Sequence, residues 1–103
     1  MSISLQVIYS ASEGSTFDHD YYTSKHFAVV DEHISQFIQS QLVTKGVADV
    51  PDQPASVHAI ATFVFKDNDA LGAALTAAGP VLADLPNFTN VQPTMLIGEV
   101  TET

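Results

Sequence analysis

The segment HAIATFVF, residues 58–65, constrains the fold of this chain more than any other stretch. In an extended strand its apolar side chains project to both sides: Ala59, Ala61, Phe63 and Phe65 to one, and Ile60 and Val64 to the other. A sheet that is covered on one face alternates apolar with polar residues, so this pattern predicts a strand buried on both faces. Both faces of the sheet must therefore be buried against other parts of the structure.

The remaining segments predict three more strands and two helices. The predicted strands are Ile3–Tyr9, Gln39–Val47 and Thr94–Val100, and the predicted helices run from Asp18 or Asp20 to about His33 and from Asp67, Asn68 or Asp69 to about Ala78. Gly79 and Pro80 should interrupt the second helix before a last turn at residues 81–83. The order predicts one α+β domain over residues 1–103: a ferredoxin-like βαββαβ sandwich with a four-stranded antiparallel sheet and two helices on one face.

Two helices can cover only one face of such a sheet. The face that the helices leave uncovered must then meet another subunit, most simply through a two-fold axis that packs two sheets face to face. The sequence therefore predicts a homodimer.

The charge balance excludes several classes of partner. Twelve acidic residues stand against three lysines and no arginine, which gives a formal net charge of −9. Such a surface repels nucleic acids and anionic membranes, and it lacks the guanidinium groups that bind phosphates and carboxylates. We therefore expect a small apolar or aromatic ligand and neither a nucleic-acid nor a membrane partner. The absence of cysteine, of a signal peptide and of a long apolar run makes the cytoplasm the expected compartment.

The segment FDHDYYTSKH, residues 17–26, gathers much of the titratable and aromatic chemistry of the chain. Tyr22 and His26 are one helical turn apart, so both can reach a ligand placed beside the helix. The phenol can donate a hydrogen bond to a carbonyl oxygen while the imidazole moves a proton. The same spacing is also typical of amphipathic core residues whose polar tips reach water or a backbone carbonyl.

The histidines of this region do not indicate a metal site. His19, His26 and His33 recur every seven residues, but each interval is roughly 10 Å along a helix and the ligands of one ion lie about 2 Å from it. Asp18 and Asp20 are expected to cap the helix rather than to bind a cation. We therefore predict no metal.

Two residues outside this segment are further candidates for contact with a ligand. His58 begins the buried strand on the side of Ile60, and it is either a core residue or a pocket residue. Phe88 lies in the loop after the second helix and is either a lid or plain packing. The chain contains no nucleophile elbow, phosphate-binding glycine loop or dinucleotide fingerprint, so those enzyme classes are set aside.

Three blocks of sequence resemble the EthD-like family, named after a component of ethyl tert-butyl ether degradation. They are FDHDYYTSKH at 17–26, HAIATFVFKDNDALGAAL at 58–75 and ADLPNFTNVQP at 83–93, and with the first strand they span nearly the whole chain. The resemblance implies a dimeric α+β barrel with a pocket between sheet and helices in each subunit. It points to Tyr22, His26, Asp84, Pro86, Asn87 and Phe88, and His58 is similar in placement to a pocket histidine of plant polyketide cyclases. Family members usually have proline where this chain has Ala28.

From these residues and this resemblance we expect an enzyme or enzyme-like protein that acts without a metal or other cofactor on a small apolar oxygenated or aromatic compound. His26 is the expected general acid or base, and Tyr22 is the expected orienting donor. The expected binding residues are Tyr9, His58, Asp84, Asn87 and Phe88. Three alternatives stay open: a non-catalytic ligand carrier or accessory protein of an oxidative degradation pathway, a structural dimer with a closed core, and a haem protein with His26 or His58 as axial ligand.

Overall fold

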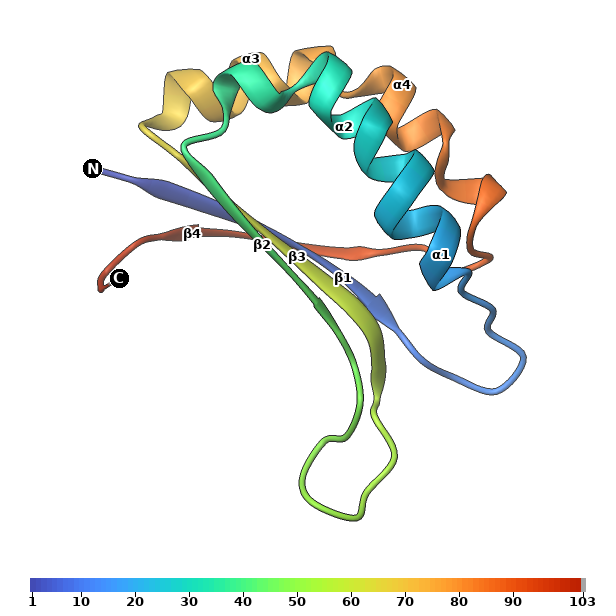
Figure 1. Ribbon diagram of the computed structural model, residues 1–103. Helices are drawn as coiled ribbons and strands as arrows, with labels where there is room; N and C mark the ends of the chain where they lie inside the picture. The colour runs from blue at the N-terminus through green and yellow to red at the C-terminus, as the bar shows by residue number, and fades with distance from the viewer. Residues whose placement is uncertain (103) are drawn as a thin grey trace.

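The structure, a computed structural model, describes residues 1–102 and has the predicted order of elements. The strands are β1 (Ile3–Ser10), β2 (Ser40–Lys45), β3 (Val57–Phe65) and β4 (Thr94–Glu99), and the helices are α1 (His19–Tyr21), α2 (Phe27–His33), α3 (Asn68–Ala77) and α4 (Gly79–Ala83). A π-helical turn, Tyr22–His26, joins α1 to α2, and 3₁₀ turns occupy Ser35–Phe37 and Leu85–Asn87. The strands form one antiparallel sheet in the order β2-β3-β1-β4, with the helices against one face (Figure 1). The predicted fold class is confirmed.

The first helical region begins where the sequence predicts but is wound differently. The Asp18 carboxylate accepts a hydrogen bond from the Tyr21 amide, so it caps the helix. The side chains of Thr23 and Ser24 donate to backbone carbonyls four residues earlier. Such bonds bend helices, and here they accompany a turn in which the Phe27 amide donates to the Tyr22 carbonyl, five residues back. The predicted continuous α-helix is therefore interrupted by one wide turn.

The second helical region divides near the predicted interruption. The Asp67 carboxylate accepts from the Ala70 amide and starts α3. Gly79 and Pro80 form the start of α4 rather than only ending α3. Proline is tolerated there because the amides of the first turn have no partner within the helix. The last turn therefore begins two residues earlier than the sequence predicts.

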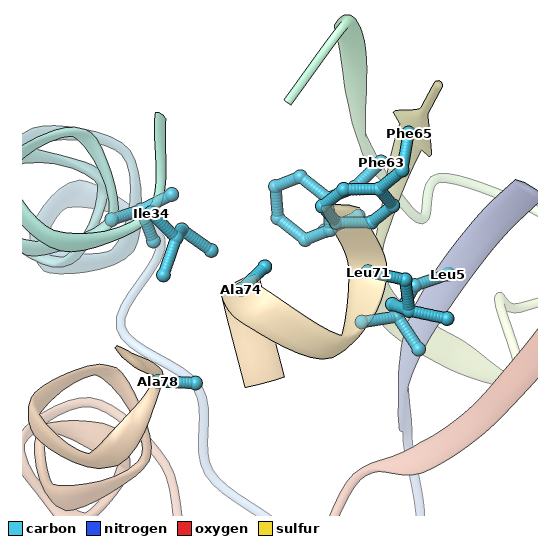
Figure 2. Packing of buried hydrophobic residues seen from close by; sticks show 9 residues of the cluster. Leu5, Ile34, Phe63, Phe65, Leu71, Ala74 and Ala78 are labelled. Carbon is cyan, nitrogen blue, oxygen red and sulfur yellow. The ribbon is translucent and has the colours of Figure 1, made fainter. Parts of the chain in front are cut away.

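Strand register decides which side chains face the helices. Leu5 of β1 lies opposite Phe63 of β3 and Ile97 of β4, so the odd-numbered residues of β1 and β3 point to the helical side. There they form a core with residues of α2, the turn after it, and α3 (Figure 2). Its buried members are Leu5, Val30, Ile34, Ala61, Phe63, Phe65, Leu71, Ala74 and Ala78. A second cluster at the other end of the helical face contains Tyr9, Tyr22, Ala59 and Phe88.

The opposite face of the sheet is open in the single chain. Ile60, Thr62 and Val64 are half-buried there, while Leu42 and Leu96 are 64% and 55% exposed. Helices cover only the other face (Figure 1). The burial of this outer face by a second subunit stays a prediction.

Within residues 1–102, no helix has the length and apolar character required to cross a membrane.

We predict opposite effects for alanine at two glycines. A Cβ atom at Gly46 would lie 2.0 Å from the Val57 backbone oxygen, whereas one at Gly72 in α3 would meet no atom within 4 Å. Gly46→Ala must push β2 and β3 apart and should lower the free energy of unfolding by about 1–3 kcal/mol. Gly72→Ala should raise it by about 0.5–1 kcal/mol because alanine favours the helix. Urea titration measures both, and a neutral Gly46→Ala variant would contradict the register.

Candidate active site

The wide helical turn places the two predicted catalytic side chains together. Tyr22 and His26 stand at its two ends, are 1% and 3% exposed, and have nearly parallel rings with centroids 5.5 Å apart. π-helical turns are rare in proteins, and a large share of those that do occur lie at functional sites. Both side chains form part of the wall of a cavity.

The cavity lies between the sheet and the helices and has a volume of about 120 Å³. Tyr9, Tyr22 and His26 are the polar residues of its wall, and the others are apolar and come mainly from β1, β3 and the helices. An apolar cavity of about 150 Å³ in another protein stays dry and binds benzene, so this one fits a molecule of about one ring. Leu82 and Met95, 48% and 45% exposed, lie at its edge and also border a groove on the surface.

A carboxylate holds His26 from behind. The Nδ1 atom of His26 lies 2.9 Å from Oδ2 of Asp84, and because a carboxylate only accepts, Nδ1 is the donor. The other oxygen, Oδ1, accepts from the Tyr21 hydroxyl at 2.7 Å and from Nδ2 of Asn87 at 2.9 Å. This arrangement fixes the tautomer of the neutral ring, so that Nε2 keeps its lone pair.

Burial and hydrogen bonding set the charges of this pair. Burial lowers the pKa of His26, and the hydrogen bond and negative charge of Asp84 offset part of that effect. Burial acts to raise the pKa of Asp84, but hydrogen bonds from Asn87, Tyr21 and His26 outweigh it and hold this pKa below its ordinary value. At neutral pH the imidazole is therefore a free base beside an ionised carboxylate.

The Tyr22 hydroxyl is buried without any hydrogen-bond partner among residues 1–102. Burial raises the pKa of Tyr22 above its ordinary value, so the phenol stays protonated. A buried polar group without a partner costs about 1–3 kcal/mol. Because Tyr22 is one of the residues that line the cavity, a ligand acceptor that reached this hydroxyl would remove the cost.

Comparison with solved structures supports the same family as the sequence blocks. No protein-family model matches the chain, and no curated protein sequence matches it. An EthD-like protein from Ralstonia eutropha JMP134 is 29% identical, with a TM-score of 0.88 and 98% of this chain and 93% of that chain covered. The resemblance to the EthD-like family is confirmed.

Solved structures of lower sequence identity share the fold. An ethyl tert-butyl ether degradation family protein from Bacillus halodurans C-125 is 17% identical, with a TM-score of 0.69 and coverage of 98% of this chain and 100% of that chain. A single-residue mutant of SnoaB from Streptomyces nogalater, a cofactor-independent oxygenase, is 13% identical, with a TM-score of 0.67 and coverage of 99% of this chain and 95% of that chain. At these identities the likeness concerns the fold alone.

Within this fold the predicted site residues fall into two groups. Tyr9, Tyr22 and His26 line the cavity. Asp84 and Asn87 lie behind His26 and belong to its hydrogen-bond network. The catalytic and binding roles of these residues stay predictions.

Phe88 and His58 lie outside the cavity wall. Phe88 is 4% exposed and packs against His26 with ring centroids 4.6 Å apart, as part of the aromatic cluster. His58 Nε2 lies 2.8 Å from the Ser15 hydroxyl, and its ring stacks on Phe17. A role of His58 in ligand binding stays a prediction, although Tyr22 and His26 meet at the cavity without it.

Sequence reasoning missed two features of the site. It did not pair His26 with Asp84, and it gave no role to Tyr21, whose hydroxyl bonds that carboxylate. The family resemblance named Asp84 but carried no information about its partner. Ala28, the departure from the family pattern, is exposed, and the helix continues through it.

The donor set and the size of the cavity limit which bound groups the site could hold. Among residues 1–102 no three histidine, aspartate or glutamate side chains converge as a set of metal ligands. Pockets for larger ligands span about 300–1,000 Å³, so a cavity of about 120 Å³ does not fit a haem macrocycle.

We predict that His26 carries its proton on Nδ1 and titrates below its ordinary value of 6.5. Because the folded chain disfavours the imidazolium, the free energy of unfolding should fall as the pH drops below about 6.5. Asp84→Asn should lower the pKa of His26 further, since the negative charge is lost while the burial remains. Nitrogen NMR of the imidazole over a pH series measures tautomer and pKa together.

Glu32→Gln is the control for this titration, because Glu32 lies beside His33 and not beside His26. It should leave the His26 curve unchanged. A rise in the pKa of His26 on Asp84→Asn, or a proton on Nε2 in the wild type, would show that the carboxylate does not hold the ring.

Proposed function

We propose that this chain is a homodimeric small-molecule enzyme that performs acid–base chemistry, without a metal or other cofactor, on an apolar oxygenated or aromatic compound. In this proposal Nε2 of His26 takes up and returns a proton, and the Tyr22 hydroxyl donates to an oxygen of the substrate. The observation that carries it is that Tyr22, whose hydroxyl has no partner among residues 1–102, lines a cavity together with His26, which is hydrogen-bonded to Asp84. Cytoplasmic location stays a prediction.

The chemistry of the pair supports a base rather than a merely buried histidine. A general base needs a free lone pair at the working pH and a fixed orientation. The lowered pKa of His26 provides the first, and the bond to Asp84 provides the second. A histidine serving only the core would gain nothing from an Nε2 atom left without a partner.

The character of the cavity favours a neutral substrate of limited size. The wall that residues 1–102 form contains no lysine, aspartate or glutamate, so a charged group would enter without a counter-charge and lose its hydration. The volume of about 120 Å³ admits roughly one ring in this closed form. SnoaB, which shares the fold, is described as a cofactor-independent oxygenase, and this supports cofactor-free chemistry on such a scaffold.

The outer face of the sheet supports the dimer in this proposal. Ile60 and Val64 flank Thr62 on β3, and Thr62 lies opposite the exposed Leu42 of β2 and opposite Gln6 of β1. The exposed Leu96 of β4 lies on the other side of Gln6. A second copy of the same face would remove these apolar side chains from water. The cavity on the opposite side of the sheet would stay accessible.

We predict that His26→Gln lowers turnover about 10²- to 10⁴-fold, because general acid–base catalysis contributes that much. The measurement is NMR of small cyclic ketones, phenols and lactones in D₂O, which reports conversion and deuterium incorporation. His33→Gln is the matched control, since His33 lies on the same helix but outside the cavity wall. Tight binding of a panel compound without any turnover in the wild type would favour the non-catalytic ligand carrier instead.

We predict that Thr62→Lys converts the dimer to monomers, because it places a charge at the centre of the outer sheet face. Sedimentation at micromolar concentration should show a dimer for the wild type and a monomer for the variant. Gln36→Lys adds the same charge at an exposed position next to the helices and should stay dimeric. A monomeric wild type would contradict the proposed assembly.

A further inference from the structure

A second tyrosine hydroxyl belongs to the same cavity. Tyr9 lies on β1, is 2% exposed and lines the wall with Tyr22 and His26. Its ring meets the Tyr22 ring edge-on, with centroids 5.6 Å apart. Burial alone raises the pKa of Tyr9 to about 12, and no hydrogen bond to another residue within 1–102 contributes. Two tyrosines with protonated hydroxyls therefore belong to the wall of one small cavity.

The polar residues that line the cavity include two hydrogen-bond donors, the tyrosine hydroxyls. Two tyrosines and one histidine are the residues with polar side chains in the described wall, while its other residues are apolar. A carbonyl oxygen accepts two hydrogen bonds and has no hydrogen of its own to place. An alcohol or phenol could place its hydrogen on a tyrosine oxygen or on Nε2 of His26, and on Nε2 it would occupy the base. A ketone leaves that nitrogen free.

We propose that Tyr9 and Tyr22 donate together to one carbonyl oxygen, and that the substrate is a neutral ketone of about one ring with a hydrogen on the carbon next to the carbonyl. This inference rests on the proposed acid–base function and names its substrate class. It adds Tyr9 to the residues that contact the reacting atoms.

The reaction that this arrangement supports is enolisation. The C–H bond next to the carbonyl breaks, its proton passes to Nε2 of His26, and the electron pair moves through carbon onto the oxygen. The resulting enolate is held by both hydroxyls, and the imidazolium is paired with Asp84. Return of the proton to the same carbon, or to another carbon of a conjugated enolate, restores His26. No oxidant or reductant is required.

The two hydroxyls favour the enolate over the ketone. Donors aimed at an oxygen that gains charge act most strongly in a site without water. Both phenols keep their protons over the working pH range because burial raises the pKa of each. The negative charge therefore develops on the substrate and not on the tyrosines.

Cyclohexanone and methylenecyclohexane test the oxygen contact as a matched pair, since a CH₂ group replaces the oxygen in the second compound. Tyr9→Phe and Tyr22→Phe should each weaken binding of cyclohexanone about 3- to 10-fold and should not weaken binding of methylenecyclohexane. The infrared C=O stretch of bound cyclohexanone should lie at lower frequency in the wild type and move back in each variant. Thermal unfolding checks that both variants are folded.

Deuterium exchange next to the carbonyl of cyclohexanone tests the base separately, and His26→Gln should abolish it. If Tyr9→Phe leaves affinity and C=O stretch unchanged, the two-donor proposal is wrong while the acid–base function stands. If the stretch responds to both variants but no exchange occurs, the carbonyl site stands and the proposed enzyme function is wrong. If the wild type binds neither compound, or binds phenol in preference to cyclohexanone, the ketone class is wrong.

Discussion

The hydrogen bond between His26 and Asp84 is the interaction on which the rest of the site depends. It joins residues 58 positions apart, one from the helical region after β1 and the other from the segment between α4 and β4. The two halves of the fold therefore meet at this bond. Without the carboxylate, a buried imidazole could hold its proton on either nitrogen. With it, one nitrogen is a donor and the other is a base.

Aromatic side chains pack around the His26–Asp84 hydrogen bond. Phe88 packs on His26, and Phe17 meets Tyr22 with ring centroids 4.9 Å apart. The loops that carry these rings are tied together, because the Asp18 amide donates to the Phe88 carbonyl and the Thr89 hydroxyl donates to the Thr16 carbonyl. The same residues thus fix both partners of the pair and exclude water, which strengthens polar contacts.

Features that depend on local sequence pattern could be predicted from the sequence. Contacts between segments that are distant in sequence could not. Alternation along β1 and the double apolar pattern of β3 predict the strands, but only the structure shows which face of β3 turns toward the helices. The spacing of Tyr22 and His26 predicts their common direction, although the wide turn between them has no sequence signal of its own. The Asp84 contact could not be predicted from spacing, because nothing near His26 in sequence indicates a carboxylate 58 positions away. Residue patterns alone did not predict the cavity, since voids depend on how whole elements pack, and only the family resemblance implied a pocket between sheet and helices.

The cavity also lowers the free energy of unfolding. At about 24 cal/mol per Å³, a void of about 120 Å³ removes roughly 3 kcal/mol, and the partnerless Tyr22 hydroxyl removes about 1–3 kcal/mol more. Small domains keep only about 5–15 kcal/mol of stability. Phenylalanine at position 22 would remove the unpaired hydroxyl, and a larger residue at Ala61 or Ala74 would fill the space. A chain selected for stability alone would have these residues, so the void and its free donors are best understood as a place kept for a ligand.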